Sequence, residues 1–408
     1  MLNFITGGVC AAQGFRAGGI HVGVKTHAAW KKDVALIVSD EDCACAAVYT
    51  KNAVKAAHIH VDKRHLADGK ARAAVINSGN ANACAPMGEE NAERVCAAAG
   101  KALGCRPEDV VVAATGVIGQ TLNVAVIEQG MPELCAAAAH TAAGSDAAAH
   151  AIMTTDTVKK ELAVETVIGG KTVRMGGIAK GSGMIHPNMG TMLCFLTTDC
   201  AISSEMIKSA LLETVQASFN RISVDGDTST NDTCCVLANG LAGNPVITEK
   251  GPDYDAFVEA LRALCVELAK KMASDGEGAT PLITCTVTGA GSEQSAETVA
   301  KSVIGSALTK AAIFGADANW GRVLCAMGYS KAPFRPEYVD ISFSSAVGAV
   351  AVCRGGMGLD FDEEAARSIL SQDEVVIDVH LHEGEHEATC WGCDLTYEYV
   401  KINGDYRT

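Results

Sequence analysis

Short runs of apolar, mostly β-branched residues alternate with longer, alanine-rich stretches along most of the chain. The runs at residues 34–38, 73–77 and 110–114 have the length and composition of buried strands. An alanine-rich stretch predicts a helix over residues 89–103. Because strands and helices alternate in this way, the pattern predicts an α/β fold.

The middle of the chain contains a predicted β-hairpin. Residues 161–167 and 172–175 flank Gly169 and Gly170, and a pair of glycines supplies the positive φ angles that tight hairpin turns need. Glycines also cluster between residues 176 and 190, which indicates a special loop that ends at a strand.

The pattern continues to predict alternating elements towards the C-terminus. Strands are expected at residues 192–198 and 282–288, and helices at 205–219 and 255–272. The tail from Tyr338, which includes residues 375–381 and 395–402, is predicted to be mostly strand, with a helix near 363–370.

Composition adds an enzyme-like core and limits the partners. Hydrophobic residues make up 48% of the 408 residues but aromatic residues only 5%, so the core must consist mainly of small aliphatic side chains. A chain of this length predicts two or three domains. The net charge of -15 argues against a nucleic-acid partner, because phosphate binding needs a basic surface. Small charged metabolites remain possible ligands.

The cysteines and the N-terminus predict a reducing compartment. The 17 cysteines are spread over a long chain, and residues 1–16 lack the basic region that begins a secretory signal. No stretch approaches the ~18 uninterrupted apolar residues of a membrane span. We therefore expect reduced thiols in a cytoplasmic protein that has no membrane partner.

Two short motifs suggest chemistry that their context disfavours. Residues 382–386 spell H-E-x-x-H, which binds zinc when a helix brings both histidines to one face, but residues 375–381 have the period of a strand. Cys390 and Cys393 form a C-x-x-C that opens a predicted strand, with no second pair at zinc-finger spacing. We interpret both motifs as structural, and no metal site is predicted.

A third motif places a threonine where unusual chemistry is possible. Thr191 follows a glycine-rich segment and precedes an apolar strand. A threonine hydroxyl needs a base, and one solution is to make the threonine a chain terminus whose own α-amine, with a pKa of about 7.7 to 8.0, is that base. Attack of the Thr191 hydroxyl on the Gly190 carbonyl, followed by hydrolysis of the ester, would create this terminus. Gly190 tolerates the distortion because it has no Cβ.

The segment from Ala179 to Asp199 closely resembles the self-cleaving ornithine acetyltransferase (glutamate N-acetyltransferase) family, which has K-G-S-G-M-I-x-P-N-M-A-T-M-L here and is cut before the threonine. The single departure at the cut is Gly190, where the family usually has alanine. The resemblance covers nearly the whole chain, in the runs at residues 14–19, 77–83, 114–119, 153–157, 223–232, 315–322 and 400–408.

The resemblance implies a role for each matching residue. Thr191 would be the nucleophile, and Thr115 and Gly116 would stabilise the oxyanion, for which each donor is worth about 3 kcal/mol. Substrate contacts would come from Thr154, Lys180, Thr191, Glu277, Asn403 and Thr408. Spacing leaves open whether Thr154 or Thr155 faces the substrate.

The resemblance also implies the fold and the reaction. It implies an α/β, two-domain, ornithine-acetyltransferase-like sandwich of sheets and helices, cut into residues 1–190 and 191–408, which stay intertwined in a heterotetramer of two chains of each kind. N-acetylornithine would acetylate Thr191, and glutamate would take the acetyl group in arginine biosynthesis. Acetyl-CoA is a further possible donor, and no cofactor is implied.

Two other functions fit the same residues. An N-terminal-nucleophile amidase would pass the acyl group to water through the same ester, so only the exclusion of water separates it from a transferase. An uncleaved amino-acid-binding protein would keep the fold without the chemistry.

Overall fold

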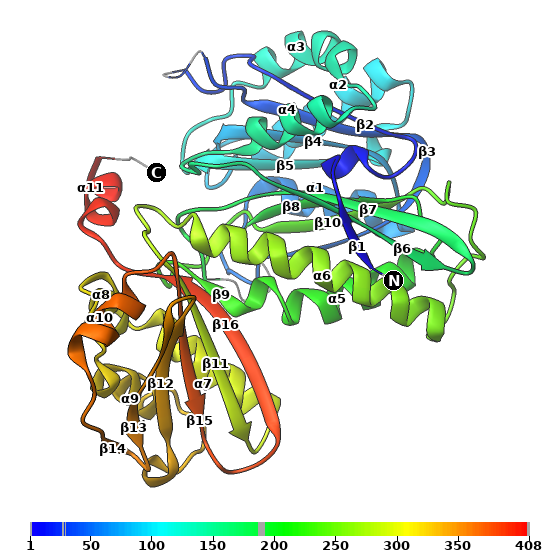
Figure 1. The fold of residues 1–408 in the computed structure, drawn as a ribbon. Coiled ribbons are helices and arrows are strands. Elements are labelled where there is room, and N and C mark those ends of the chain that lie inside the picture. The colour runs from blue at the N-terminus through cyan, green and yellow to red at the C-terminus, as the bar shows by residue number, and fades with distance from the viewer. Residues whose placement is uncertain (1, 27, 29, 187–191, 406–408) are drawn as a thin grey trace.

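The computed structural model describes residues 2–26, 28, 30–186 and 192–405. These residues form a mixed α/β fold with two sheets, one of nine strands and one of seven. The larger sheet and its helices make up the upper part of Figure 1, and the smaller sheet the lower part. The predicted α/β sandwich of sheets and helices in two parts is therefore confirmed.

The larger sheet interleaves strands from both sides of the Gly190–Thr191 bond. Its order is β1-β6-β7-β8-β10-β3-β4-β5, with β2 paired to β3. Its strands are β1 (Asn3–Ile5), β2 (Phe15–Ile20), β3 (Val34–Tyr49), β4 (Lys70–Asn80), β5 (Val110–Val117), β6 (Lys160–Ile168), β7 (Lys171–Lys180), β8 (Leu193–Thr198) and β10 (Thr233–Ala238). β8 and β10 pair with each other and lie between β7 and β3. Two strands that follow residue 191 are thus enclosed by strands that precede residue 190.

Helices cover both faces of this sheet because its central strands are apolar on both sides. In β8, Leu193 and Phe195 join a core with α4, whereas Cys194 and Leu196 join a core with α5 and α6. The helices of this part are α1 (Ala57–His65), α2 (Gly88–Leu103), α3 (Val124–Ala137), α4 (Ala142–Ile152), α5 (Ser204–Gln216) and α6 (Pro252–Ser274).

The smaller sheet comes entirely from the second half of the chain. Its order is β14-β13-β12-β15-β11-β16-β9. Its strands are β9 (Ile222–Ser223), β11 (Leu282–Ala290), β12 (Asp340–Ser345), β13 (Gly348–Arg354), β14 (Met357–Gly358), β15 (Glu374–His380) and β16 (His386–Cys393). The remaining helices are α7 (Glu293–Gly305), α8 (Ala307–Phe314), α9 (Trp320–Gly328), α10 (Glu363–Leu370) and α11 (Tyr397–Asp405).

Most predicted elements are present, and one is wrong. The hairpin is β6 and β7, and its turn residues Gly169 and Gly170 have φ values of +55° and +73°. Residues 395–402, predicted as strand, instead lead into helix α11. The hydroxyl of Thr396 accepts a hydrogen bond from the backbone N–H of Tyr399 at 3.4 Å, so a threonine just before the helix satisfies one of its first free donors.

Both discounted motifs lie in strands and turns. His382 lies in the turn after β15, and His386 begins β16, so H-E-x-x-H is not helical. Cys390 and Cys393 are buried within β16. The pair therefore ends this strand, whereas the sequence predicted that it would open one. All 17 cysteines lie in the described part of the chain, and each has a free thiol.

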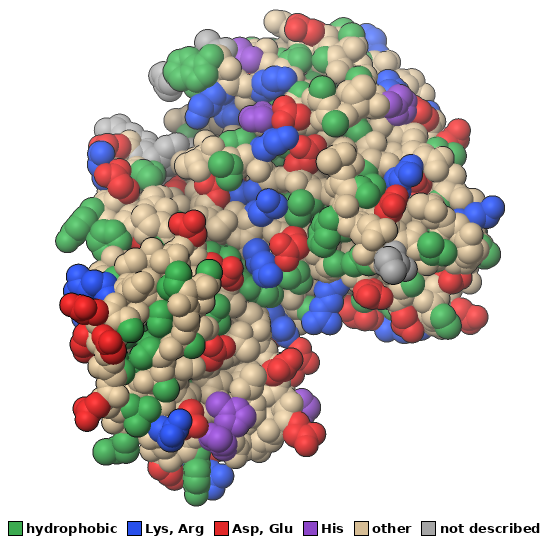
Figure 2. Space-filling model, viewed as in Figure 1, with side chains coloured by type: hydrophobic (Ala, Val, Ile, Leu, Met, Phe, Trp, Pro, Cys, Tyr) green, Lys and Arg blue, Asp and Glu red, His purple; other side chains and the backbone are tan. Residues whose placement is uncertain are grey.

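On the face seen in Figure 2, acidic and basic side chains are interspersed over both parts of the molecule. Among the helices that the structure describes, none has the length and apolar character needed to cross a membrane.

Candidate active site

Loops from both parts of the molecule enclose a cavity of about 250 Å³. Its walls come from the ends of β5 and β7, the segments after α4, α6 and β9, and helix α11. The lining includes six residues predicted for the site: Thr115, Gly116, Thr154, Lys180, Glu277 and Asn403. Gly190, Thr191 and Thr408 were also predicted and lie outside the described residues.

Thr115 and Gly116 form the wall at the end of β5, which pairs with β4 through residues 73–80. Gly116 has a φ of +129°, and a Cβ there would approach the backbone carbon of Gly79 to 2.4 Å. Only glycine allows the two strands to approach so closely here. The backbone of this wall is thereby fixed next to the Thr115 hydroxyl.

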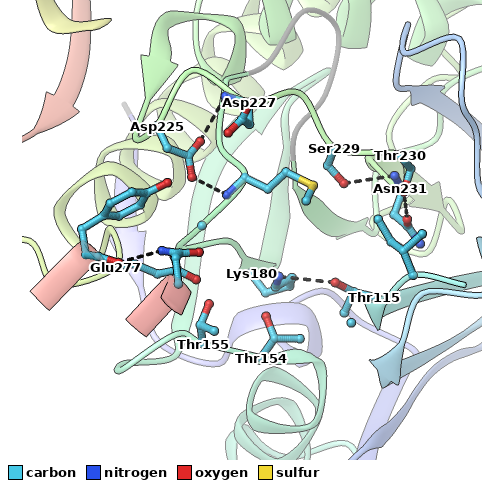
Figure 3. A pocket seen from close by; sticks show the side chains of 16 residues that line it. Thr115, Thr154, Thr155, Lys180, Asp225, Asp227, Ser229, Thr230, Asn231 and Glu277 are labelled. Carbon is cyan, nitrogen blue, oxygen red and sulfur yellow. Dashed lines mark hydrogen bonds between the residues drawn. The ribbon is translucent and has the colours of Figure 1, made fainter. Parts of the chain in front are cut away.

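Lys180 lies at the centre of the cavity, at the end of β7 (Figure 3). Its side chain is only 8% exposed, and its Nζ donates to the Thr115 hydroxyl at 3.4 Å. Burial lowers the pKa of the Lys180 ammonium below its ordinary value, although the nearby Asp156 carboxylate opposes this shift. A charge held here with little water interacts strongly with an anionic group of a ligand.

A buried ion cluster beneath the cavity holds the segments around Lys180. The Lys160 ammonium donates to Asp156 at 2.6 Å and to Asp275 at 2.5 Å. Asp156 also accepts from the backbone N–H groups of Thr154 and Gly181, at 3.0 and 2.8 Å. This ion cluster, defined as Lys160, Asp156 and Asp275, therefore fixes three neighbouring segments of the cavity wall.

Glu277 provides the opposite charge. It is 7% exposed, and its Oε2 accepts a hydrogen bond from the Asn403 side chain of α11 at 2.7 Å. A Cβ at Gly183 would come within 2.3 Å of Glu277 Oε1, so a glycine is required for this carboxylate to sit where it does. The cavity consequently holds a buried cation and a buried anion, which matches a ligand that carries both charges.

Two acidic residues in the cavity wall were missed by sequence reasoning. Asp225 and Asp227 line the same side as Glu277 (Figure 3). Asp225 accepts from the backbone N–H groups of Met184 and Ile185 at 2.6 and 2.9 Å. Burial raises the pKa of Asp225, although these hydrogen bonds oppose the shift. Tyr399 of α11 also lines the cavity, and burial, followed by the Asp225 charge, raises the pKa of its phenol.

Asn231 is a further missed residue, and it joins the two halves of the chain. Its side-chain amide donates to the backbone carbonyls of Ala81 and Ala114 at 2.6 and 2.8 Å. It thereby positions the strand end that carries Thr115. The signal for the missed residues was the polar run at 223–232, which the sequence analysis used only to recognise the family.

Thr154 and Thr155 both line the cavity on its lower side in Figure 3, so the structure leaves the choice between them open. Chemically, the site offers hydroxyl and backbone donors at one wall, a buried ammonium in the centre and carboxylates opposite. This arrangement can orient a small amino acid and stabilise charge that develops at a carbonyl.

Comparisons with known proteins agree on one family. The model of the ArgJ family matches residues 16–408. The arginine biosynthesis bifunctional protein ArgJ of Symbiobacterium thermophilum is 51% identical over 408 residues, covering 100% of each chain. The arginine biosynthesis bifunctional protein ArgJ 1 of Clostridium acetobutylicum is 49% identical over 395 residues, and the match covers 97% of this chain and 96% of that protein.

A solved structure with the same name supports this assignment. The chain of the arginine biosynthesis bifunctional protein from Bacillus halodurans superimposes with a TM-score of 0.50 and is 47% identical. The match covers 52% of this chain and 98% of that one. The family model and the full-length relatives both span nearly the entire sequence. The chain described here therefore belongs to the ArgJ family.

Proposed function

We propose that this chain is a self-cleaving glutamate N-acetyltransferase of arginine biosynthesis. It breaks its own backbone between Gly190 and Thr191, and Thr191 then takes the acetyl group of N-acetylornithine and passes it to glutamate. The observation that carries the proposal is the cavity of an ArgJ-family chain in which Lys180 and Glu277 are both buried beside Thr115 and Gly116.

The charges of the cavity suit both proposed substrates. N-acetylornithine and glutamate each carry a carboxylate, for which the Lys180 ammonium is the partner. The side-chain ammonium of ornithine and the amino group of glutamate find partners in the carboxylates on the opposite side. Thr154, Asn403 and Thr408 complete the proposed contacts, and Thr115 and Gly116 stabilise the oxyanion as acetyl-Thr191 forms and breaks down.

Two observations support self-cleavage. β8 begins two residues after Thr191 and is hydrogen-bonded to β7 on one side and β10 on the other, so the fragment that follows a cut at Gly190–Thr191 would stay bound in the sheet through β8. The solved chain of the Bacillus halodurans relative covers only 52% of the chain described here. The Symbiobacterium thermophilum relative, by contrast, covers 100% of it. A protein cut near its middle has this property.

The names of the relatives extend the proposal to a second donor. Several are called bifunctional, and the same acetyl-Thr191 ester can be formed from acetyl-CoA. We propose that this chain uses both donors. Formation of N-acetylglutamate from acetyl-CoA and glutamate, without N-acetylornithine, tests this point.

The first experiment is an intact-mass measurement combined with terminal sequencing. We expect two fragments instead of one chain of 42.1 kDa, and a new terminus that reads Thr-Met-Leu-Cys. Thr191→Ala should block both cleavage and transfer, while Thr191→Ser retains part of each because it keeps a hydroxyl. A full-length chain that is active, or an active Thr191→Ala variant, contradicts the mechanism.

The second experiment identifies the acceptor. With N-acetylornithine present, product analysis with and without glutamate should show that rapid ornithine release depends on glutamate. Equal release of acetate without glutamate would indicate an amidase instead. An uncleaved chain that binds but does not convert these amino acids would indicate a binding protein.

Location and assembly belong to the same proposal. We propose that the enzyme works in the cytoplasm as a heterotetramer of two fragments of each kind. Cell fractionation and native mass spectrometry test the two statements separately.

A further inference from the structure

One part of the cavity wall belongs to no helix or strand. Residues 153–155, called the 153–155 segment below, follow α4 and precede β6. Thr154 and Thr155 both line the cavity, so the path of this backbone sets where their side chains lie (Figure 3). Because the segment has no ladder of backbone hydrogen bonds, other contacts must hold it in place.

The ion cluster holds the 153–155 segment from one side. The Asp156 carboxylate accepts the backbone N–H of Thr154 at 3.0 Å, and the Lys160 ammonium donates to Asp156 at 2.6 Å. At the other side, Met153 is the C-cap of α4. The carbonyls at the end of a helix have no partner within the helix, so the Met153 carbonyl needs a donor from elsewhere.

Lys25, in the loop between β2 and β3, supplies that donor. Its Nζ donates to the carbonyl of Met153 at 2.8 Å and to the carbonyl of Lys32, in its own loop, at 2.9 Å. An ammonium at the C-terminal end of a helix also interacts favourably with the helix dipole. Lys25 therefore joins its loop to the cavity wall across 128 residues of sequence.

The backbone and the side chain of Lys25 are both held in place. Asp33 is fully buried, and its carboxylate accepts from the backbone N–H groups of Val22, Gly23 and Lys25 at 2.7, 3.1 and 3.0 Å. The side chain then passes Gly79, where an added Cβ would approach the Lys25 Cγ to 2.8 Å. The fold thus directs this ammonium to the end of α4.

Keeping an ammonium at this position costs stability. Burial lowers the pKa of Lys25 from 10.5 to about 8, although the Asp33 carboxylate opposes the shift. Within the described part of the chain, the hydrogen-bond acceptors of the Lys25 Nζ are two neutral carbonyls and no carboxylate. An apolar side chain would avoid this desolvation cost. The cost indicates that the ammonium is retained for its contact with Met153.

We propose that Lys25 is a positioning residue for substrate binding, which holds the 153–155 segment in the cavity wall through the Met153 carbonyl. This inference rests on the proposed function, because the segment carries the proposed substrate contact Thr154. Lys25 is not among the residues that line the cavity, so it acts through the segment and not on the substrate. Its removal should therefore weaken the binding of both substrates more than it slows the chemical steps.

The first test compares Lys25→Met with Lys301→Met. Methionine is a long side chain without an N–H donor or a charge. Lys301 is a matched control, because burial also lowers the pKa of its ammonium, and it donates to the backbone carbonyl of Asn220 at 2.8 Å, away from the cavity. In Lys25→Met we expect KM to rise about tenfold for N-acetylornithine and for glutamate, and kcat to change less than about threefold. In Lys301→Met we expect both constants to match the wild type.

Chemical rescue distinguishes positioning from a general effect on folding. Lys25→Ala removes the side chain beyond Cβ, and n-propylammonium has the size and the N–H donors of the missing part. Added n-propylammonium should return the raised KM values of Lys25→Ala towards those of the wild type. Tetramethylammonium has the same charge but no N–H donor, so it should not. Lys25→Arg keeps N–H donors and should also keep lower KM values than Lys25→Met.

Measurements of folding and cleavage accompany the kinetics. Thermal unfolding shows whether each variant is folded, and intact mass gives the cleaved fraction to which each rate is referred. If Lys25→Met does not fold, Lys25→Gln replaces it as the variant without an ammonium.

The outcomes separate the role of Lys25 from the proposed function. Wild-type KM values in Lys25→Met, a loss confined to kcat, or equal effects of the two ammonium compounds on Lys25→Ala overturn the role of Lys25 and leave the proposed function intact. A wild-type chain that transfers no acetyl group refutes the proposed function, and the role of Lys25 with it.

Discussion

At the scale of a single residue, replacing Lys180 tests whether this ammonium binds both proposed substrates. It is buried in the cavity, and a hydrogen bond to a charged group is worth about 1.5 to 3 kcal/mol, with every ~1.4 kcal/mol corresponding to a factor of ten. We expect Lys180→Ala to lower kcat/KM at least about tenfold for N-acetylornithine and for glutamate alike. Lys159→Ala is the control, because Lys159 pairs with Asp146 and Glu161 at the surface.

Steady-state kinetics with both substrates varied measures this effect. Parallel double-reciprocal lines, with losses in both half-reactions, are expected if the two substrates occupy one cavity in turn. Intersecting lines, or a Lys180→Ala variant with normal kinetics for both substrates, would contradict a shared site.

Replacing Gly116 tests whether the cavity wall at the end of β5 makes the proposed oxyanion contact. An added Cβ would collide with the backbone of Gly79, so Gly116→Ala must displace the end of β5. We expect at least a ~100-fold loss of kcat, comparable to the loss of an oxyanion donor. Gly119→Ala is the control, since Gly119 also has a positive φ, +80°, but has open space around its Cβ position. Equal losses in the two variants would mean that backbone strain alone is responsible.

Sequence reasoning found residues with an obvious chemical role and missed those that position them. Lys180 and Glu277 were predicted from the family motif, and both lie in the cavity. Asn231 was missed because its function depends on carbonyl groups that are more than a hundred residues away in the sequence. Such contacts depend on the sheet order, which no local pattern specifies.

At the scale of elements, strands and helices with clear periodicity were predicted well, and the last helix was not. Residues 395–399 alternate apolar and polar side chains, as a strand does. The alternation is overridden because Thr396 caps a helix, and because Asn403 donates to the backbone carbonyl of Tyr399 at 3.0 Å and to Glu277 at 2.7 Å. The helix therefore forms against the site and not within a sheet.

Deleting residues 397–408 tests whether α11 serves the site more than the fold. None of the described residues of α11 is buried, so we expect unfolding temperatures within a few degrees of the wild type. We also expect KM to rise about tenfold or more, because Glu277 loses its Asn403 partner, an interaction of about 1.5 to 3 kcal/mol. Asn403→Ala should reproduce much of this rise, and Lys401→Ala should not. A truncated enzyme with normal KM values would contradict a role for α11 in binding.

At the scale of the whole molecule, the ion cluster links stability to pH. Burial alone would raise the pKa of Asp156, but the ammonium groups of Lys160 and Lys180 outweigh burial and hold it below the ordinary value of 3.8. A carboxyl with a lowered folded-state pKa contributes stability above its unfolded pKa and loses it as the pH falls through the folded value. Asp156→Asn should cost about 3 to 5 kcal/mol at pH 7, and less below about pH 4.

Urea unfolding between pH 7 and pH 3 measures this difference. Asp62→Asn is the comparison, and its effect on the free energy of unfolding should have the opposite sign. Burial raises the pKa of Asp62, so the ionised form of this carboxyl destabilises the fold at neutral pH. Removing that charge should help more at pH 7 than at pH 3. A pH-independent difference for Asp156→Asn would contradict the ionised cluster.

The cut between residues 190 and 191, and the two intertwined chains that it would leave, stay predictions from the family resemblance, and the strand order that would interlock the chains could not be predicted from the sequence. Nothing in the local pattern indicates that β8 and β10 insert between β7 and β3, because strand order is set by long-range packing. The same strands place Leu193 and Phe195 in one core and Cys194 and Leu196 in another. The segments before and after the proposed cut thus share two cores and one hydrogen-bonded sheet.

This interleaving predicts how the protein would behave after the proposed cut. Separating residues 1–190 from 191–408 would break the β7–β8 and β10–β3 ladders and expose both cores to water, at a cost comparable to unfolding. We expect the fragments to co-elute in native gel filtration even at micromolar dilution, and to separate only in denaturant. Urea should unfold the parts of the larger sheet that belong to the two fragments in a single transition. Mass analysis then identifies each fragment. Fragments that separate without denaturant, while the remaining protein keeps its activity, would contradict the shared sheet.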